Sequence, residues 1–228
     1  MKFLPIEYAT RNLGRSPMRL ILNSIGNTIV ILLIMIAFGF IVGMNSTLNV
    51  SGSNKNIMLL GAGSLESVER SEVKKEAARI IASSISGYKV RAQVEGISPE
   101  VHIQIPININ TKDELILIRG IQSEAFLVHD KVNITFGLLP RVGENELLVG
   151  RLAARTLGYQ IPEEAIGENI TLDNDNYTIS GIMNAGGGVI ESEIWAPLSD
   201  LLITTQRDTL SCIVVALENN TQSAIEGF

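Results

Sequence analysis

The longest hydrophobic run in the chain lies near its N-terminus and predicts a membrane-spanning helix. No Asp, Glu, Lys or Arg occurs from Leu20 to Asn54, and Ile29 to Met44 holds no side chain more polar than methionine. At about 1.5 Å per residue, a helix from Leu20 to Asn45 would be about 39 Å long, which exceeds the roughly 30 Å hydrocarbon core of a bilayer. Lipid offers the backbone no hydrogen bonds, so a spanning segment of this kind must be helical. We therefore predict a transmembrane helix at residues 20–46.

The charges on either side of this run predict its orientation. Residues 1–19 carry four cationic side chains and one acidic one, a net charge of +3, and the next cationic residue is Lys55. Cytoplasmic flanks of spanning helices are enriched in Lys and Arg, so we expect a cytoplasmic N-terminus and an extracytoplasmic main domain. Two alternatives stay open. A cleavable signal peptide has a shorter apolar region, of about 7–15 residues, and a buried core helix fits a long unbroken apolar run poorly.

Residues 1–19 have the pattern of a short amphipathic helix lying in the lipid headgroup region. Its helical wheel has an apolar face with Phe3, Ile6, Ala9 and Leu13, and a cationic face with Arg11, Arg15 and Arg19. Such a helix buries its apolar face and places its cations beside lipid phosphates. We therefore predict that Arg11, Arg15 and Arg19 lie at the membrane interface. An unstructured basic anchor is the alternative.

Four residues of the apolar run indicate packing against other helices. Asn23 and Asn27 are four residues apart and share one helical face, where amides exposed to lipid would be costly. Gly39 and Gly43 form a G-x-x-x-G pair, which allows close approach of two helix backbones. Alternatively, the asparagines lie in the cytoplasmic interface and the glycines are incidental.

From residue 47 onward the pattern predicts an α+β domain with a mixed sheet. The expected strands are residues 57–60, 88–94, 101–110, 114–121, 146–149, 169–172, 177–183, 193–196 and 210–217, and the expected helices are 64–86, 151–157 and 198–204. Strict alternation makes 101–110 the clearest strand, and Pro106 within it predicts an edge position. The turn at 173–176 predicts a hairpin. Strands and helices without βαβ regularity indicate the α+β class.

Charge and cysteine content exclude some classes of function. The whole chain has a net charge of −6, so residues 20–228 are strongly acidic, whereas nucleic-acid binding needs a basic face. Cys212 is the only cysteine and cannot form an internal disulfide, and no Cys/His spacing suggests a zinc site. We therefore expect no nucleic-acid partner and no metal.

The motifs of known catalytic and cofactor sites are absent from the sequence. It has no G-x-x-x-x-G-K-[ST] phosphate loop and no G-x-S-x-G nucleophile motif. Gly186–Gly188 is interpreted as a mobile turn, and 173–176 lacks the glycine and the closing glutamate of a calcium loop. His102 and His129 are interpreted as surface or edge residues. We therefore expect binding or mechanical coupling, with no catalytic, cofactor-binding or metal residue.

Two groups of motifs stand out along the chain. The first lies directly before the apolar run and is YATRNLGR (8–15), with Arg19 and Leu22. The others follow in the main domain: Arg119-Gly120-Ile121, Phe136-Gly137, ENELLVGRLAARTLG (144–158), IGENITL (166–172), YTISGIM (177–183) and IWAPLSDL (194–201). In their order and spacing these motifs resemble the permease subunits of MacB-like ABC transporters, which share the FtsX-like membrane domain and include lipoprotein-releasing permeases.

The resemblance implies an architecture and a set of partners. It implies a first spanning helix followed by a periplasmic core domain at 47–228 with two subdomains. The porter-like one comprises about 55–118 and 208–228, and the inserted one about 119–207. It also implies a cell-membrane permease, homo- or heterodimeric in the bilayer, that couples ATP hydrolysis by a partner ABC ATPase to movement of the outer domain, for export or lipoprotein release. An extracytoplasmic protein would be a further partner.

The chain also departs from the pattern of this family. Such permeases have three further spanning helices after the core domain, whereas this sequence stops at Phe228, so we expect a fragment of a permease. The alternative function is a single-pass, membrane-anchored extracytoplasmic binding module without transport activity.

Overall fold

The computed structural model describes residues 17–51, 55–64, 67–84, 87–109, 112–173 and 175–218. Its contacts divide the chain into two compact units, residues 1–46 and 47–228. The predicted amphipathic segment, with Arg11 and Arg15, lies outside the described residues, except for its last three positions.

The first unit contains most of a long apolar helix, α2 (Pro17–Ser51). It begins at a proline, which suits a first helical position because its missing N–H needs no partner there. Residues 17–46 of α2 are long and apolar enough to cross a membrane, and none of the tested span is buried within the protein. Leu, Ile and Phe side chains exposed in this way would be unfavourable in water, at about 25 cal/mol per Å². The helix is therefore a candidate transmembrane span.

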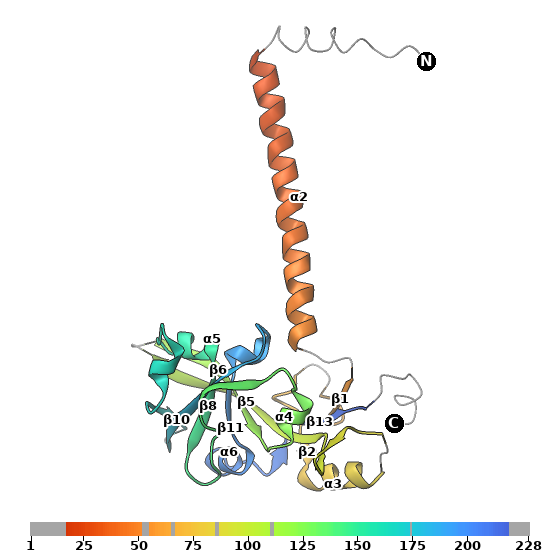
Figure 1. Ribbon diagram of the computed structural model, residues 1–228, viewed down its shortest axis with the longest axis vertical. Helices are drawn as coiled ribbons and strands as arrows, with labels where there is room; N and C mark the ends of the chain where they lie inside the picture. Colours follow the sequence, from red (N-terminus) through yellow and green to blue (C-terminus); the bar gives the residue numbers. More distant parts are fainter. Residues whose placement is uncertain are drawn as a thin grey trace. The chain divides into compact units, whose positions relative to one another are not determined.

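Residues 47–228 are built on a nine-stranded mixed sheet (Figure 1). Its strands run in the spatial order β1 (Asn56–Leu60), β13 (Cys212–Ala216), β5 (Ile97–Ile109), β6 (Lys112–Ile121), β11 (Ile194–Pro197), β8 (Glu146–Gly150), β10 (Asp175–Asn184) and β7 (Asn133–Gly137), with β9 (Asn169–Leu172) pairing to β10. Two pairs, β6 with β11 and β8 with β10, are parallel and the others are antiparallel. This arrangement confirms the α+β class.

Short helices and two small ladders complete the unit. The helices are α3 (Lys75–Ser84), α4 (Ala125–Val128), α5 (Arg151–Thr156) and α6 (Leu198–Thr204), and the 3₁₀ turns are η1 (Pro162–Ala165) and η2 (Val189–Ser192). The ladders pair β2 (Val73–Lys74) with β12 (Thr209–Leu210) and β3 (Val90–Arg91) with β4 (Val94–Glu95). The α6 helix matches its predicted range, and the predicted hairpin is formed by β9 and β10.

The long strand β5 joins the two ends of the sheet. Its first residues, 97–100, pair with β13, whereas 101–109 pair with β6. Pro106 lies opposite Leu115 of β6, and among the described residues its other side has no strand neighbour. A proline cannot donate to a ladder, so the predicted edge position is confirmed at that point of the strand.

Strand β13 is buried on both faces, as its unbroken apolar sequence indicates. Ile213 and Val215 pack into the largest core cluster, whereas Cys212, Val214 and Ala216 pack into a smaller cluster on the other face. Strand β1 pairs with the edge of β13 that faces away from β5, so segments from opposite ends of this unit lie side by side (Figure 1).

Two predicted elements are wrong in extent. The helix expected at 64–86 begins only at Lys75, because Ser71 accepts a hydrogen bond from the backbone N–H of Gly61 and residues 73–74 form the ladder with β12. The strand expected at 88–94 is reduced to a bridge at Tyr88 and to β3. Ala92 and Gln93 have positive φ and turn the chain back into β4.

Gly150 joins β8 to α5 and provides a test of the packing there. A Cβ at this position would overlap the backbone of Glu191, and backbone atoms cannot move away as a flexible side chain can. We expect Gly150→Ala to lower the free energy of unfolding by about 1–3 kcal/mol, as overpacking does, in urea titrations followed by circular dichroism. Arg155→Ala on the exposed side of α5 is the control, within about 0.5 kcal/mol of the wild type. Equal stabilities of the two variants would contradict this packing.

Candidate functional site

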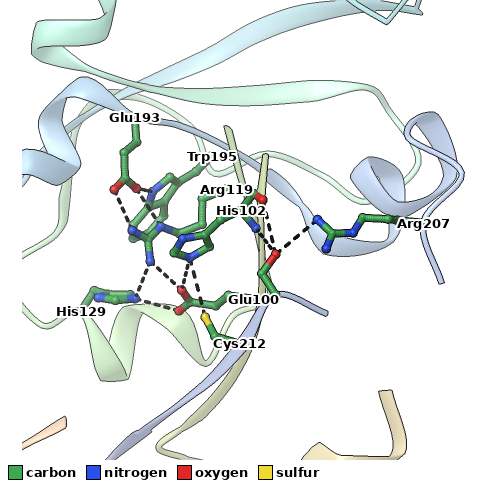
Figure 2. Close-up of polar contacts among 9 residues, drawn as sticks. Glu100, His102, Arg119, His129, Glu193, Trp195, Arg207 and Cys212 are labelled. Carbon is green, nitrogen blue, oxygen red and sulfur yellow. Dashed lines mark hydrogen bonds and ion pairs between the residues drawn. The ribbon is translucent and has the colours of Figure 1, made fainter. Parts of the chain in front are cut away.

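A group of polar side chains is buried where four neighbouring strands meet (Figure 2). The strand register brings it together, because Cys212 of β13 lies opposite Glu100 of β5. His102 of β5 lies opposite Arg119 of β6, and Arg119 in turn lies opposite Trp195 of β11. Directly opposed residues project from the same face of a sheet, so these side chains converge. We call this set the buried cluster; Glu193, just before β11, and His129, just after α4, complete it.

Glu100 is the acceptor at the centre of the buried cluster. Its side chain is fully buried, and one carboxylate oxygen, Oε2, lies 2.6 Å from Arg119 Nη1 and 3.1 Å from His102 Nε2. The other oxygen, Oε1, lies 2.7 Å from His129 Nε2. An ionised carboxylate can only accept hydrogen bonds, so both imidazole Nε2 atoms donate to it. Three segments of the chain thus supply donors to one carboxylate.

Arg119 connects Glu100 to a second buried carboxylate. Its Nε and Nη2 atoms each donate to an oxygen of Glu193 at 2.7 Å, the two-pronged geometry in which guanidinium and carboxylate fit best. Trp195 Nε1 donates to Glu193 Oε2 at 2.9 Å. The guanidinium carbon also lies 5.8 Å from the centre of the Trp195 ring, within the range of a cation–π contact.

Burial and charge oppose each other at both carboxylates. Burial raises the pKa of a carboxyl group, but the Arg119 guanidinium and His129 beside Glu100 hold the pKa of that carboxyl well below its usual value. Burial also disfavours the ionised form of Glu193, but the charge of the Arg119 guanidinium outweighs this effect and lowers the pKa of Glu193. The two carboxylates in return raise the pKa of Arg119 despite its burial. The two carboxylates and the Arg119 guanidinium are therefore ionised at neutral pH.

The arrangement can hold chain segments together but does not activate a nucleophile. Burial raises the pKa of the Cys212 thiol, whereas a reactive cysteine needs a lowered pKa. Removing one partner from a buried ion pair leaves an uncompensated charge and is strongly destabilising. The cluster therefore acts as an electrostatic clasp between strands.

The prediction that His102 and His129 are surface or edge residues is wrong. The His102 and His129 side chains are only 7% and 10% exposed, because both lie against Glu100. The signal that could have indicated this is the spacing of polar residues in otherwise apolar strands. Glu100-x-His102 and Glu193-x-Trp195 each place two polar groups on one strand face. Their convergence depends on long-range register, which no local pattern specifies.

The predicted membrane residues lie in the other unit. Arg19, Asn23 and Asn27 are exposed on α2, and a Cβ added at Gly39 or Gly43 would meet nothing within 4 Å. Interfacial and helix-packing roles for these residues remain predictions.

The glycine-rich segment after β10 is a turn, as predicted, whereas its mobility stays a prediction; the turn encloses a further buried carboxylate. The backbone N–H groups of Ala185 and Gly187 donate to Glu191 Oε1 at 3.1 and 2.9 Å. Gly186 and Gly187 have positive φ, which glycine adopts without strain. These hydrogen bonds hold the turn against η2.

Comparison with known proteins shows which proteins have this fold. The sequence matches the family described as MacB-like periplasmic core domain over residues 20–226. The structure is similar to the periplasmic region of MacB from Actinobacillus actinomycetemcomitans, with a TM-score of 0.57 and 14% identity, covering 78% of this chain and 81% of that one. It is also similar to the extracellular domain of the noncanonic ABC-type transporter YknZ from Gram-positive bacteria, with a TM-score of 0.56 and 14% identity, covering 75% and 87% of the two chains. No curated protein matches the sequence.

Replacing Arg119 tests whether the clasp stabilises the domain. We expect Arg119→Met to lower the free energy of unfolding at pH 7 by about 3–5 kcal/mol, because two buried carboxylates lose their cation. Arg141→Met is the matched control, since the Arg141 side chain is 68% exposed where it pairs with Glu146 and ion pairs open to water contribute less than buried ones. The free energy of unfolding of both variants is measured by urea titration at pH 7. If Arg119→Met lost as little unfolding free energy as Arg141→Met, a stabilising role of the clasp would be contradicted.

The lowered pKa of Glu193 predicts a pH dependence with a defined sign. A carboxyl with a folded-state pKa below the unfolded value of about 4.5 stabilises the fold above that pH, and the contribution is lost as the pH falls through the folded-state pKa. We expect Glu193→Gln to be about 1–3 kcal/mol less stable than the wild type at pH 7, with the difference shrinking below pH 4.5. Exposed Glu114→Gln is the control. A difference that stays constant with pH would show that Glu193 acts by shape alone.

Proposed function

Because this chain belongs to the MacB-like periplasmic core domain family, we propose that it is a permease subunit of an ABC transporter, whose extracytoplasmic domain moves when a partner ATPase hydrolyses ATP. The observation that carries the proposal is the extent of the family match. It covers residues 20–226 and so includes most of the apolar helix α2 together with the folded unit. A membrane helix continuous with such a domain is the arrangement that mechanical transmission requires.

The hydrogen-bonded order of strands supports transmission of force. The next element after α2 is β1, and only four residues lie between the end of α2 and the start of β1. Strand β1 pairs with β13 over five residues, and β13 pairs with β5, which carries Glu100. Force on the linker would therefore reach the buried cluster through two hydrogen-bonded ladders.

In our proposal the buried cluster joins the two subdomains expected from the sequence. Glu100, His102 and Cys212 come from the porter-like part, residues 55–118 and 208–228. Arg119, His129, Glu193 and Trp195 come from the inserted part, residues 119–207. The clasp would make both parts move together when the membrane helix moves.

The partners follow from the same proposal. The sequence has no phosphate-binding loop, so ATP hydrolysis would be the work of another chain, and a second permease subunit would complete a homo- or heterodimer in the bilayer. The movement would serve export or lipoprotein release.

A second candidate function, a membrane-anchored binding module without transport, is favoured by one surface feature. A pocket of about 360 Å³ is lined by Ile121, Phe126 and Leu139, among others. Val142, which also lines the pocket, and Leu138, next to Leu139 in the sequence, are 73% and 74% exposed. Exposed apolar clusters of this kind mark interaction sites, so the pocket would hold an apolar group of an extracytoplasmic partner.

Lengthening the linker distinguishes the two functions. We expect insertion of a flexible Gly-Ser segment between Ser51 and Asn56 to leave ATP hydrolysis by the co-expressed ATPase intact while abolishing export, because a flexible linker transmits no force. A rigid helical insert of equal length is the control. Failure of the chain to copurify with any ABC ATPase, with partner binding unaffected by the insert, would favour the binding module.

Thiol labelling tests the proposed orientation. Ile203 on α6 is 76% exposed, so Ile203→Cys should react with a membrane-impermeant maleimide in spheroplasts, whereas Lys2→Cys should react only after permeabilisation. The wild type is the background control, because its only cysteine, Cys212, is fully buried. Labelling of Lys2→Cys in intact spheroplasts would overturn the orientation.

A further inference from the structure

The buried cluster contains a set of potential metal ligands, and one of them, the Cys212 thiol, takes part in no ion pair of the clasp. Oxygen of Glu100, Nε2 of His102 and Sγ of Cys212 all lie within 4.8 Å of one another. Figure 2 shows these side chains converging, with His129 on the far side of the carboxylate. We propose that Glu100, His102 and Cys212 form a binding site for a thiophilic divalent cation of the zinc class.

The separations between the donor atoms fit such an ion. Glu100 Oε2 lies 3.1 Å from His102 Nε2, which lies 3.9 Å from Cys212 Sγ. Zn²⁺ bound tetrahedrally at about 2.0–2.3 Å from each ligand holds its ligand atoms roughly 3.3–3.7 Å apart. The two separations from His102 Nε2 are thus within a few tenths of an ångström of coordinating distances, and the third, from Glu100 to Cys212, is at most 4.8 Å.

The fourth position has a nearby candidate ligand. His129 Nε2 already contacts the other oxygen of Glu100, at 2.7 Å. A site with three protein ligands can take a water molecule or a nearby imidazole as the fourth. Imidazole, thiolate and carboxylate together are a donor set that Zn²⁺ accepts and that Mg²⁺ and Ca²⁺ do not favour.

The charges of the cluster favour a dication. Glu100 and Glu193 bring two carboxylates to the site against the one guanidinium of Arg119, so with neutral imidazoles one negative charge is in excess. Metal binding deprotonates the Cys212 thiol, because the thiolate is the ligand. With that thiolate and a divalent ion, the charges of the site sum to zero. The thiol proton is released to solvent, and the His102 proton that Nε2 donates to Glu100 in the metal-free site moves to Nδ1, which frees Nε2 to bind the metal.

Arg119 does not prevent this arrangement. Only Nη1 of its guanidinium contacts Glu100, whereas Nε and Nη2 are both held by Glu193. A metal ion would replace one Arg119 contact and leave the two-pronged pair with Glu193 in place. Arg119 would then remain anchored by Glu193 alone.

A pocket gives the ion a route to the site. It has a volume of about 380 Å³, and His102 lies on its wall together with Glu69 and Gln104. Gln104 Nε2 donates to Glu69 Oε1 at 3.3 Å, so a carboxylate is held at the same opening. Arg70 and Arg207 also line this pocket, and Arg207 is engaged with the backbone oxygen of Ser71.

Cobalt spectroscopy tests the site on the full chain in nanodiscs. Co²⁺ added to chelator-treated wild type should give tetrahedral d–d absorption and a thiolate-to-cobalt charge-transfer band, both bleached by one equivalent of Zn²⁺. We expect His102→Gln to weaken binding by more than about 100-fold, beyond the loss from residues that only orient a ligand. Cys212→Ser should abolish the charge-transfer band.

The matched control moves the thiol to the surface. The double variant Cys212→Ser/Ile203→Cys keeps one cysteine but places it at an exposed position of α6, and it should give no stoichiometric charge-transfer band. If a variant fails to fold, native mass spectrometry of the wild type still measures how many zinc ions are bound per chain. Wild type without one bound zinc per chain, or a band equally strong in the double variant, would overturn the site. Neither result bears on ATPase pairing, so the proposed function is tested separately.

Discussion

A carboxylate removed from water must receive hydrogen bonds and a nearby positive charge, and Glu100 imposes this requirement on the centre of the folded unit. Its partners Arg119 and His129 and its neighbour His102 come from β6, the end of α4 and β5. Arg119 and His102 are fixed in turn by strand pairing and His129 by the end of α4, so the sheet order and the charge balance depend on one another. A buried ion pair adds little net stability compared with apolar packing, but breaking it is costly. What it supplies here is a defined alignment of strands that are distant in sequence.

This alignment gives the domain a physical basis for transmitting movement. Core packing alone tolerates many apolar substitutions, whereas a two-pronged pair between Arg119 and Glu193 accepts only a narrow range of positions. The clasp therefore resists sliding of β6 against β11 and of β5 against β6. In the proposed permease such resistance would let a shift of α2 reach the inserted part. A metal ion bound by Glu100, His102 and Cys212 would add a further constraint at the same junction.

The local features of the fold could be predicted from the sequence, because they depend on local patterns. Alternation identified β5, the apolar run identified α2, and the turn at 173–176 identified the β9–β10 hairpin. The start of α3 could not be predicted, since it depends on a hydrogen bond between Gly61 and Ser71. The exposed strand β7 and the short helix α4 were missed, because neither has a distinct periodicity. The buried cluster was missed for a different reason: Glu100, Arg119 and Glu193 meet only through the register of three strands.

Amide hydrogen exchange on the full chain in nanodiscs tests most directly whether the clasp ties these strands together. The informative variant is Arg119→Lys, which keeps the charge but cannot form the two-pronged pair with Glu193. If the clasp ties these strands together, Arg119→Lys should show faster amide exchange in β5, β6, β11 and β13 together, with exchange in β9 and the outer part of β10 unchanged. Faster exchange confined to the residues beside position 119 would contradict this prediction, because the clasp would then stabilise only its own strand.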